Sequence, residues 1–171
     1  MLNKTVIEIP YDEEQFAKQL MLAPHWVKTV SARVGYVAEA LIIDYFNQNE
    51  VVAEAINEDI KLGDNGKGDF YTTSFSESGE KEIVEIKVSD TLRDGQFSGS
   101  VPDPYVKLYS ELEEQRKQEK FFEAKKWFVF AYVDRKNNVI NIWAIVSREE
   151  FLKDRFKIPG YPDFWVYRLP K

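Results

Sequence analysis

The sequence predicts a mixed α/β protein in which helices flank a central sheet. Three observations indicate this class: a long amphipathic helical pattern near the N-terminus, strand-like segments that follow it, and a charged helical stretch that separates the early strands from the late ones. Helices and strands that alternate along a chain in this way form layered α/β domains. With 171 residues, the chain is expected to form a single domain over residues 1–171.

Two helices are predicted before the first strands. The first begins near Asp12, a suitable N-cap, and ends at Pro24. The second runs from Ser31 to Gln48, where apolar residues recur at helical spacing (Val34, Val37, Ala38, Leu41, Ile42 and Tyr45). Glu39 lies at the edge of this apolar stripe. Gly35 costs a helix up to about 1 kcal/mol relative to Ala, and the close approach of another element would be one reason to keep it.

Strand patterns follow the second helix. Residues 51–57 are a weak candidate, whereas residues 69–75 are rich in strand-forming side chains. A turn over residues 76–80 leads to a clear strand over residues 82–88, so the last two strands should form a hairpin. Residues 89–104, rich in Gly, Ser, Asp and Pro, are expected to form a loop.

The second half of the chain predicts one long helix and three more strands. The expected elements are a helix over 104–125, strands over 127–133 and 139–146, a short helix over 148–152 capped by Ser147, and a last strand over 164–169.

Composition excludes several kinds of chemistry. The chain has no cysteine, which excludes disulfides, zinc–thiolate sites and cysteine nucleophiles. His25 is the only histidine, and we interpret it as a turn or surface residue. The absence of cysteine fits a reducing compartment. The N-terminus has no apolar signal segment, and no run of 18 apolar residues exists. We therefore expect a cytoplasmic protein with no membrane partner.

Charge is distributed unevenly along the chain. The net charge of −6 argues against a generic nucleic-acid binder. Residues 1–113 carry ten basic and twenty-one acidic side chains, whereas residues 114–171 carry thirteen basic and eight acidic ones. This asymmetry is compatible with a phosphate-facing surface late in the chain, and equally with an ordinary solvated face.

Glu85 and Lys87 form the candidate catalytic pair. Alternate side chains of a strand share one face, so the two should lie about 7 Å apart along an open face of their strand. The predicted hairpin brings Asp69 opposite them. Two carboxylates can bind Mg²⁺, and a lysine can orient water or stabilise negative charge, which is what phosphodiester hydrolysis needs. Alternatively, Glu85 and Lys87 form a solvated ion pair worth under about 1 kcal/mol, and Asp69 caps a glycine-rich turn.

Asp69, followed after fifteen residues by Glu85-Ile86-Lys87, resembles the PD-(D/E)XK nuclease superfamily, which includes many restriction and some homing endonucleases. The resemblance implies a restriction-endonuclease-like αβββαβ core with a mixed central sheet flanked by helices, over about residues 31–146. It implies that Asp69, Glu85 and the backbone carbonyl of Ile86 bind Mg²⁺, for which Mn²⁺ can substitute. Lys87 would position the attacking water, and Glu39 matches the family's helix glutamate. The family's proline before the aspartate is Gly68 here, which weakens the match slightly.

The expected function is therefore that of a Mg²⁺-dependent, sequence-preferring DNA endonuclease of restriction or homing type. Its substrate would be double-stranded DNA, and a homodimer is expected because a chain this small needs two copies to cut both strands. The alternatives are a Holliday-junction resolvase or DNA-repair exonuclease of the same fold, and a non-catalytic DNA-binding accessory protein.

DNA contacts are expected in three places, each of which could instead be an ordinary exposed segment. They are the loop after the catalytic strand (Arg93, Gln96, Ser98 and Ser100), the following helix (Arg116, Lys117 and Lys120, with Lys125 and Lys126 at its end) and the turn between the two late strands (Arg135 and Lys136).

Overall fold

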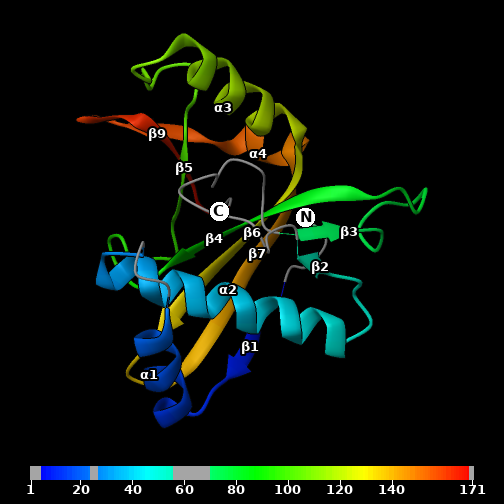
Figure 1. Ribbon diagram of the computed structural model, residues 1–171, viewed down its shortest axis with the longest axis vertical. Helices are drawn as coiled ribbons and strands as arrows, with labels where there is room; N and C mark the ends of the chain where they lie inside the picture. The colour runs from blue at the N-terminus through cyan, green and yellow to red at the C-terminus, as the bar shows by residue number, and fades with distance from the viewer. Residues whose placement is uncertain (1–4, 24–26, 56–69, 170–171) are drawn as a thin grey trace.

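The computed structural model, drawn in Figure 1, describes residues 5–23, 27–55 and 70–169. The mixed α/β class predicted from the sequence is confirmed. The helices are α1 (Glu13–Leu22), α2 (Val30–Gln48), α3 (Leu112–Ala124) and α4 (Arg148–Asp154). The strands are β1 (Ile7–Pro10), β2 (Glu54–Ala55), β3 (Phe70–Thr72), β4 (Glu82–Ser89), β5 (Gly99–Pro102), β6 (Lys125–Asp134), β7 (Val139–Ser147), β8 (Phe156–Ile158) and β9 (Tyr161–Tyr167).

The larger sheet is mixed, as the sequence predicts. It has six strands in the order β1-β7-β6-β4-β3-β2. Strands β4 and β6 are parallel, whereas the other neighbouring pairs are antiparallel. Parallel neighbours need a long crossover connection, and here the chain passes through β5 and α3 between them. A second, antiparallel sheet has the order β5-β9-β8.

The large sheet is covered differently on its two faces. Helices α1 and α2 lie together over one face, whereas α3, α4 and β9 lie in the upper half of the view in Figure 1. The α2 face holds an aliphatic core that includes Val37, Ile42, Ile86 and Ile142. The other face holds an aromatic core, built by α3, α4 and strands β5, β6, β7 and β9.

The helix starts follow from local hydrogen bonding. Asp12 caps α1, as predicted, by accepting from the backbone N–H of Gln15 at 2.9 Å. Ser147 caps α4, also as predicted, by accepting from the N–H of Glu150 at 3.1 Å. Thr29 caps α2 in the same way. Such caps satisfy backbone donors that the first helical turn leaves unpaired.

Two glycines behave differently from each other. Close approach of another element does not explain Gly35 within the described part of the chain, because a Cβ atom there would meet nothing within 4 Å. Gly99 in β5 does make a close approach, since a Cβ atom there would overlap the ring of Phe130. Glycine therefore lets β5 cross directly over β6, and this crossing places β5 beside the end of β4.

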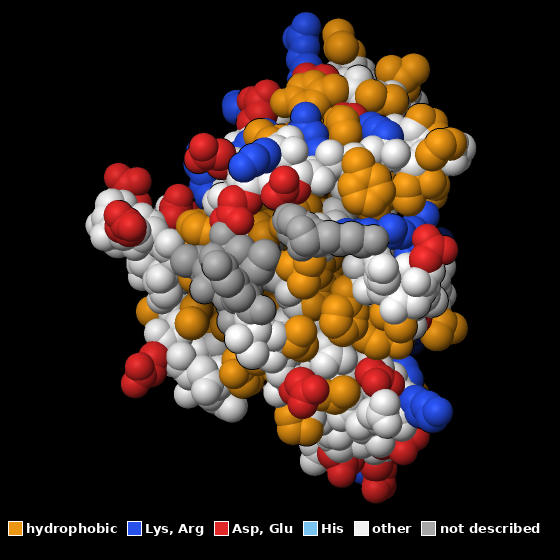
Figure 2. Space-filling model, turned by 180° about the vertical axis from the view of Figure 1, so that it is seen from behind, with side chains coloured by type: hydrophobic (Ala, Val, Ile, Leu, Met, Phe, Trp, Pro, Cys, Tyr) orange, Lys and Arg blue, Asp and Glu red, His pale blue; other side chains and the backbone are white. Residues whose placement is uncertain are grey.

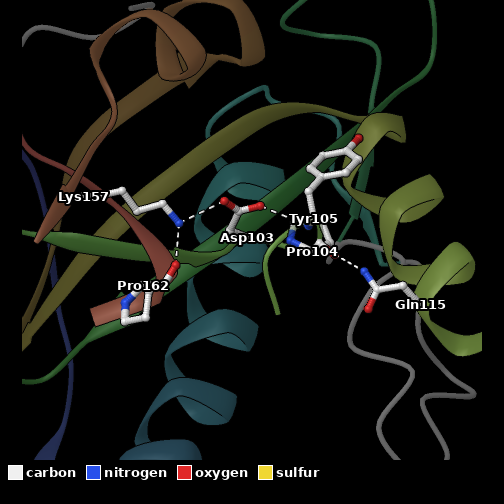
Figure 3. A network of polar contacts seen from close by, with 6 residues as sticks. All are labelled: Asp103, Pro104, Tyr105, Gln115, Lys157 and Pro162. Carbon is white, nitrogen blue, oxygen red and sulfur yellow. Dashed lines mark hydrogen bonds and ion pairs between the residues drawn. The ribbon is translucent and has the colours of Figure 1, made fainter. Parts of the chain in front are cut away.

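The expected loop over residues 89–104 and the expected helix over 104–125 both needed correction. Strand β5 lies inside the first range, and α3 begins only at Leu112. Asp103, which is 3% exposed, accepts from the N–H of Tyr105 at 3.0 Å and from Lys157 Nζ at 2.9 Å (Figure 3). Gln115 in α3 accepts from the N–H of Tyr109 and donates to the carbonyl of Pro104. These side-chain bonds occupy backbone groups that a longer helix would need.

Further differences concern short strands. Strands β1 and β8 lie in segments for which no strand was predicted. Of the segments expected as strands, the described residues 51–53 and 73–75 lie outside β2 and β3. Within the described ranges, no helix has both the length and the apolar character required to cross a bilayer.

Candidate active site at the end of strand β4

Glu85 lies in β4 and is buried, with an exposed fraction of 3%. The predicted alternation of β4 is confirmed: Val84 and Ile86 enter the aliphatic core, and Glu85 faces the other side. The expectation that this other face is open was wrong at Glu85. Its neighbour across the parallel pairing is Phe128, a member of the aromatic core, so the chain that covers this core also covers Glu85.

Two lysines hold the carboxylate of Glu85. Lys87 Nζ lies 3.0 Å from Oε1, and Lys125 Nζ lies 3.2 Å from Oε2. The Lys87 side chain is 26% exposed, whereas that of Lys125 is 9% exposed. The alternation of side chains along β4 predicted that Glu85 and Lys87 share one face, and their contact confirms this.

Lys125 is the residue that sequence reasoning missed. It was expected at the end of a helix, but it is the first residue of β6 and pairs with Ile83. The register then skips Lys126, so Trp127 pairs with Val84. Irregular pairing of this kind turns a side chain away from the face that strict alternation predicts. One sequence feature could have indicated the role of Lys125. It is a strand that starts at the Lys125-Lys126 pair, directly after the crossover helix.

Glu85 stays ionised at neutral pH. Burial raises the pKa of its carboxyl group, but the charges of Lys87 and Lys125 outweigh this effect and hold the pKa below its ordinary value of 4.5. Among the described residues, the buried atom Oε2 is contacted by Lys125 and has no well-aligned hydrogen bond. A carboxylate oxygen has more than one acceptor position.

A pocket of about 240 Å³ opens beside Lys87. Its polar walls come from the end of β4, the following loop and the start of β5, and they carry cations and hydroxyl groups (Lys87, Ser89, Thr91, Arg93, Ser98 and Ser100). None of its described lining residues is acidic. Tyr161 from the second sheet lines it as well, and the Arg93 guanidinium lies 5.6 Å from the centre of that ring. Such walls suit an anion.

A tight turn positions Arg93. Its backbone exchanges two hydrogen bonds with Gln96, of 3.1 and 3.0 Å. Between them, Asp94 and Gly95 have φ values of 53° and 69°. Two successive residues with positive φ form the tight turn that suits a hairpin. Arg93 thereby lines the pocket, whereas Gln96 lines a separate groove together with Asp94 and Arg168.

The structure therefore gathers part of the predicted site. Arg93, Ser98 and Ser100 line the pocket of Lys87, and Gln96 does not. Glu39 is half-buried on α2, the helix that packs on β4. The Ile86 side chain is buried at 2% exposure in the aliphatic core, and its backbone lies in the parallel pairing with β6, opposite Val129.

Asp69 and His25 lie outside the described residues. The predicted hairpin is confirmed beside Asp69, because Phe70 pairs with Val84, the residue before Glu85. Among the described residues, no three acidic or histidine side chains gather closely enough to hold a metal ion.

The other basic residues expected at DNA lie elsewhere. Arg116, Lys117 and Lys120 are exposed on α3 and do not line the pocket. Figure 2 shows many basic side chains in the upper half of the molecule, interspersed with acidic and apolar ones. Arg135 lies 4.8 Å from the ring of Phe16 in α1, on the aliphatic side of the large sheet, and Lys136 is exposed beside it.

Comparison with known proteins shows no family for this chain. No protein-family model matches it, and neither a curated protein nor a solved structure does. A functional conclusion has to come from the motif and from the geometry around Glu85.

Proposed function

We propose that this chain is a Mg²⁺-dependent DNA endonuclease of the PD-(D/E)XK type, which hydrolyses phosphodiester bonds with sequence preference. One observation carries the proposal: an ionised, buried carboxylate, Glu85, lies 3.0 Å from Lys87, and Lys87 also lines a pocket suited to an anion. An anionic metal ligand, an amine and a phosphate-binding surface are the components of metal-assisted phosphodiester hydrolysis.

The order of elements supports the same proposal. Helix α2, strands β2, β3 and β4, helix α3 and strand β6 follow one another as αβββαβ, with the short β5 inserted in the crossover. Strands β2, β3, β4 and β6 are neighbours in that order in the large sheet. The candidate residues Glu85 and Lys87 lie on the third of these strands.

The residues present are compatible with a divalent cation. Carboxylate and carbonyl oxygens are the ligands that Mg²⁺ prefers, and Glu85 Oε2 is a buried acceptor without an aligned hydrogen bond. In this proposal Glu85, the carbonyl of Ile86 and Asp69 would hold the ion. When bound, Mg²⁺ supplies polarisation of the phosphate and a lowered pKa of its water.

The side chains of this chain would then have separate roles. An ammonium carries three donors, so Lys87 can orient a water molecule or a phosphate oxygen while it contacts Glu85. Lys125 keeps Glu85 ionised and fixed in position, as its 3.2 Å contact and its burial indicate. Arg93, Ser98 and Ser100, which line the pocket, would bind a phosphate group of the DNA.

A plasmid-cleavage assay with Mg²⁺ or Mn²⁺ tests the proposal. Discrete fragments support a site-specific endonuclease, and a smear favours the exonuclease alternative. We expect Lys87→Ala to slow cleavage at least about a hundredfold, as loss of one donor to a transition state typically does. Lys153→Ala removes an exposed lysine of α4 and is the matched control. Unchanged cleavage by Lys87→Ala would refute the role of Lys87.

The active form is proposed to be a homodimer on double-stranded DNA. Sedimentation velocity with a cleavable duplex in the presence of Ca²⁺ measures the stoichiometry. Two chains per duplex support the proposal, whereas one chain per duplex that still produces double-strand breaks contradicts it.

A further inference from the structure

We infer that the pocket beside Lys87 binds a phosphomonoester, the group found at the phosphorylated end of a DNA strand. The inference rests on the proposed function only in naming DNA as the molecule that carries this group. The pocket itself is defined by its charge, its hydroxyl groups and its shape.

The charges around the pocket match a dianion. Arg93 and Lys87 line it, and Lys125 lies behind Lys87 on the same carboxylate. Together, Arg93, Lys87, Lys125 and Glu85 carry a net charge of +2. A phosphomonoester carries a charge of about −1.5 to −2 at neutral pH. An internal phosphodiester carries only one negative charge.

One hydroxyl group at the pocket, that of Ser98, has unused hydrogen-bonding capacity. Among the described residues, the Oγ atom of Ser98 is buried and has no hydrogen-bond partner. Buried polar atoms are nearly always paired in native proteins, and Ser98 lines the pocket, so rotation of its side chain would let the hydroxyl donate to a bound phosphate. Ser100 lines the same pocket from the next outward position of β5. The three terminal oxygens of a phosphomonoester are strong acceptors that can serve these donors.

The shape of the pocket favours a terminal group. Its volume of about 240 Å³ is smaller than the roughly 300–1,000 Å³ of sites for drug-sized molecules. Four chain segments wall it, and Gly99 lets β5 close one side by lying directly on Phe130. A terminal phosphate can enter such a pocket from one direction, whereas an internal phosphodiester needs an exit for the chain on both sides.

Tyr161 provides a neighbouring surface for the rest of the strand end. It is 38% exposed, and its ring lies beside the Arg93 guanidinium. An exposed aromatic ring next to a cationic phosphate site can stack a base of single-stranded nucleic acid. The groove on the far side of the Arg93 turn lacks this character, because it is lined by Asp94 and Asp154 as well as by apolar side chains.

Direct binding measurements in EDTA test the inference without any cleavage. Three fluorescent oligonucleotides of one sequence are compared: one with a 5′-phosphate, one with a 3′-phosphate and one with hydroxyl groups at both ends. We expect one of the phosphorylated oligonucleotides to bind at least about tenfold more tightly than the hydroxyl form, from charge-assisted hydrogen bonds. The preferred oligonucleotide identifies which end of the strand is recognised, and inorganic phosphate should compete with it.

Substitutions assign the effect to the pocket. Arg93→Gln and Ser98→Ala should each reduce the preference for the phosphorylated end, whereas the exposed control Lys153→Gln should preserve it. Titration of the unmodified chain with inorganic phosphate should also shift the amide resonances of Ser98, Gly99 and Ser100. Because the titration uses the unmodified chain, it tests the phosphate site even if a variant does not fold.

Equal affinity for all three oligonucleotides, or no amide shifts at residues 98–100, would overturn the inference. The outcome is separable from that of the proposed function. End preference without plasmid cleavage would contradict the nuclease proposal and leave the phosphate site standing. Plasmid cleavage without end preference would support the nuclease proposal and contradict the phosphate site.

Discussion

The two faces of the large sheet are built from different chemistry. The face under α1 and α2 is a largely aliphatic core that takes Val84 and Ile86 from β4, Val129 from β6 and Ile142 from β7, with a smaller group of phenylalanine rings. The opposite face carries stacked rings. The ring centroid of Phe130 lies 5.0 Å from that of Tyr167 and 5.2 Å from that of Trp143. This aromatic core draws on β5, β6, β7, β9, α3 and α4, and ends at the boundary with β4.

The difference shows where a fold can accommodate charge. Because the aromatic core ends at β4, the side of this strand that carries Glu85 and Lys87 can hold ionised groups beside a pocket. The aliphatic face of the same strand offers no such place, since α2 packs directly on it. Strand β4 therefore packs Val84 and Ile86 into the core and holds the charged residues of the candidate site on its other side.

Replacement of Glu85 should have the largest effect on stability. Glu85→Gln leaves Lys125, which is 7% exposed, without its counter-charge. Loss of one partner from a buried ion pair typically costs about 3–5 kcal/mol, so we expect a large loss in the free energy of unfolding, measured with urea. The double variant Glu85→Gln/Lys125→Met should recover much of this loss. A single variant as stable as the parent would show that the pair is not buried as described.

A pair of glycine substitutions compares the aromatic face with the exposed part of α2. Gly99→Ala places a methyl group on the Phe130 ring, and overpacking of this kind costs about 1–3 kcal/mol. Gly35→Ala meets nothing within 4 Å and should stabilise the helix by up to about 1 kcal/mol. Thermal unfolding of both variants measures the contrast. Changes of the same sign would contradict the close approach at β5.

The ion pair within the second sheet, between Lys157 of β8 and Asp103 after β5, should contribute less than the buried pair at Glu85. Lys157→Met removes the 2.9 Å ion pair with Asp103, whose carboxylate is buried and keeps its bond from the Tyr105 N–H. Hydrogen bonds to charged groups contribute about 1.5–3 kcal/mol, so we expect a loss of this order in urea unfolding. Lys153→Met, at an exposed position on α4, is the control. Equal stability of the two variants would show that Asp103 does not anchor β5.

The sequence predicted those features that depend on residues close together in the chain. Period-two alternation placed Glu85 and Lys87 on one face, and side-chain capping placed Asp12 and Ser147 at helix starts; the structure confirms both. The hairpin before Glu85 followed from a turn between two strand patterns, and the pairing of Phe70 with Val84 confirms it.

Features that depend on contacts between distant segments were not predictable. Lys125 reaches Glu85 through a parallel pairing across forty residues and an irregular register, neither of which leaves a local pattern. Glu85 is buried because segments late in the chain cover its face of β4. Strand β5 escaped detection because its glycine and proline resemble a loop, although Gly99 is required by the ring beneath it.

The smallest expected effect is on the pH dependence of the free energy of unfolding. Substitutions on the charged face of β4 should change this dependence, whereas those on the aliphatic face should not. The attraction of Lys87 and Lys125 outweighs burial and lowers the pKa of Glu85 in the folded chain below its ordinary value of 4.5. A carboxylate with a lowered folded pKa contributes stability that is fully present above its unfolded pKa and is lost as the pH falls through its folded pKa. The parent chain should therefore exceed Glu85→Gln in stability by a constant amount above about pH 5, and this difference should shrink on further acidification.

Urea unfolding of both chains between about pH 7 and pH 3 measures that difference directly. Other carboxylates titrate in both chains and cancel in the comparison, because only residue 85 differs. A further substitution on the aliphatic face, Ile86→Val, introduces no titratable group, so its cost should not depend on pH. If the stability difference between the parent and Glu85→Gln stayed constant or widened toward low pH, the two lysines would not be holding an ionised carboxylate, and the assignment of Glu85 as an anionic ligand would lose its electrostatic basis.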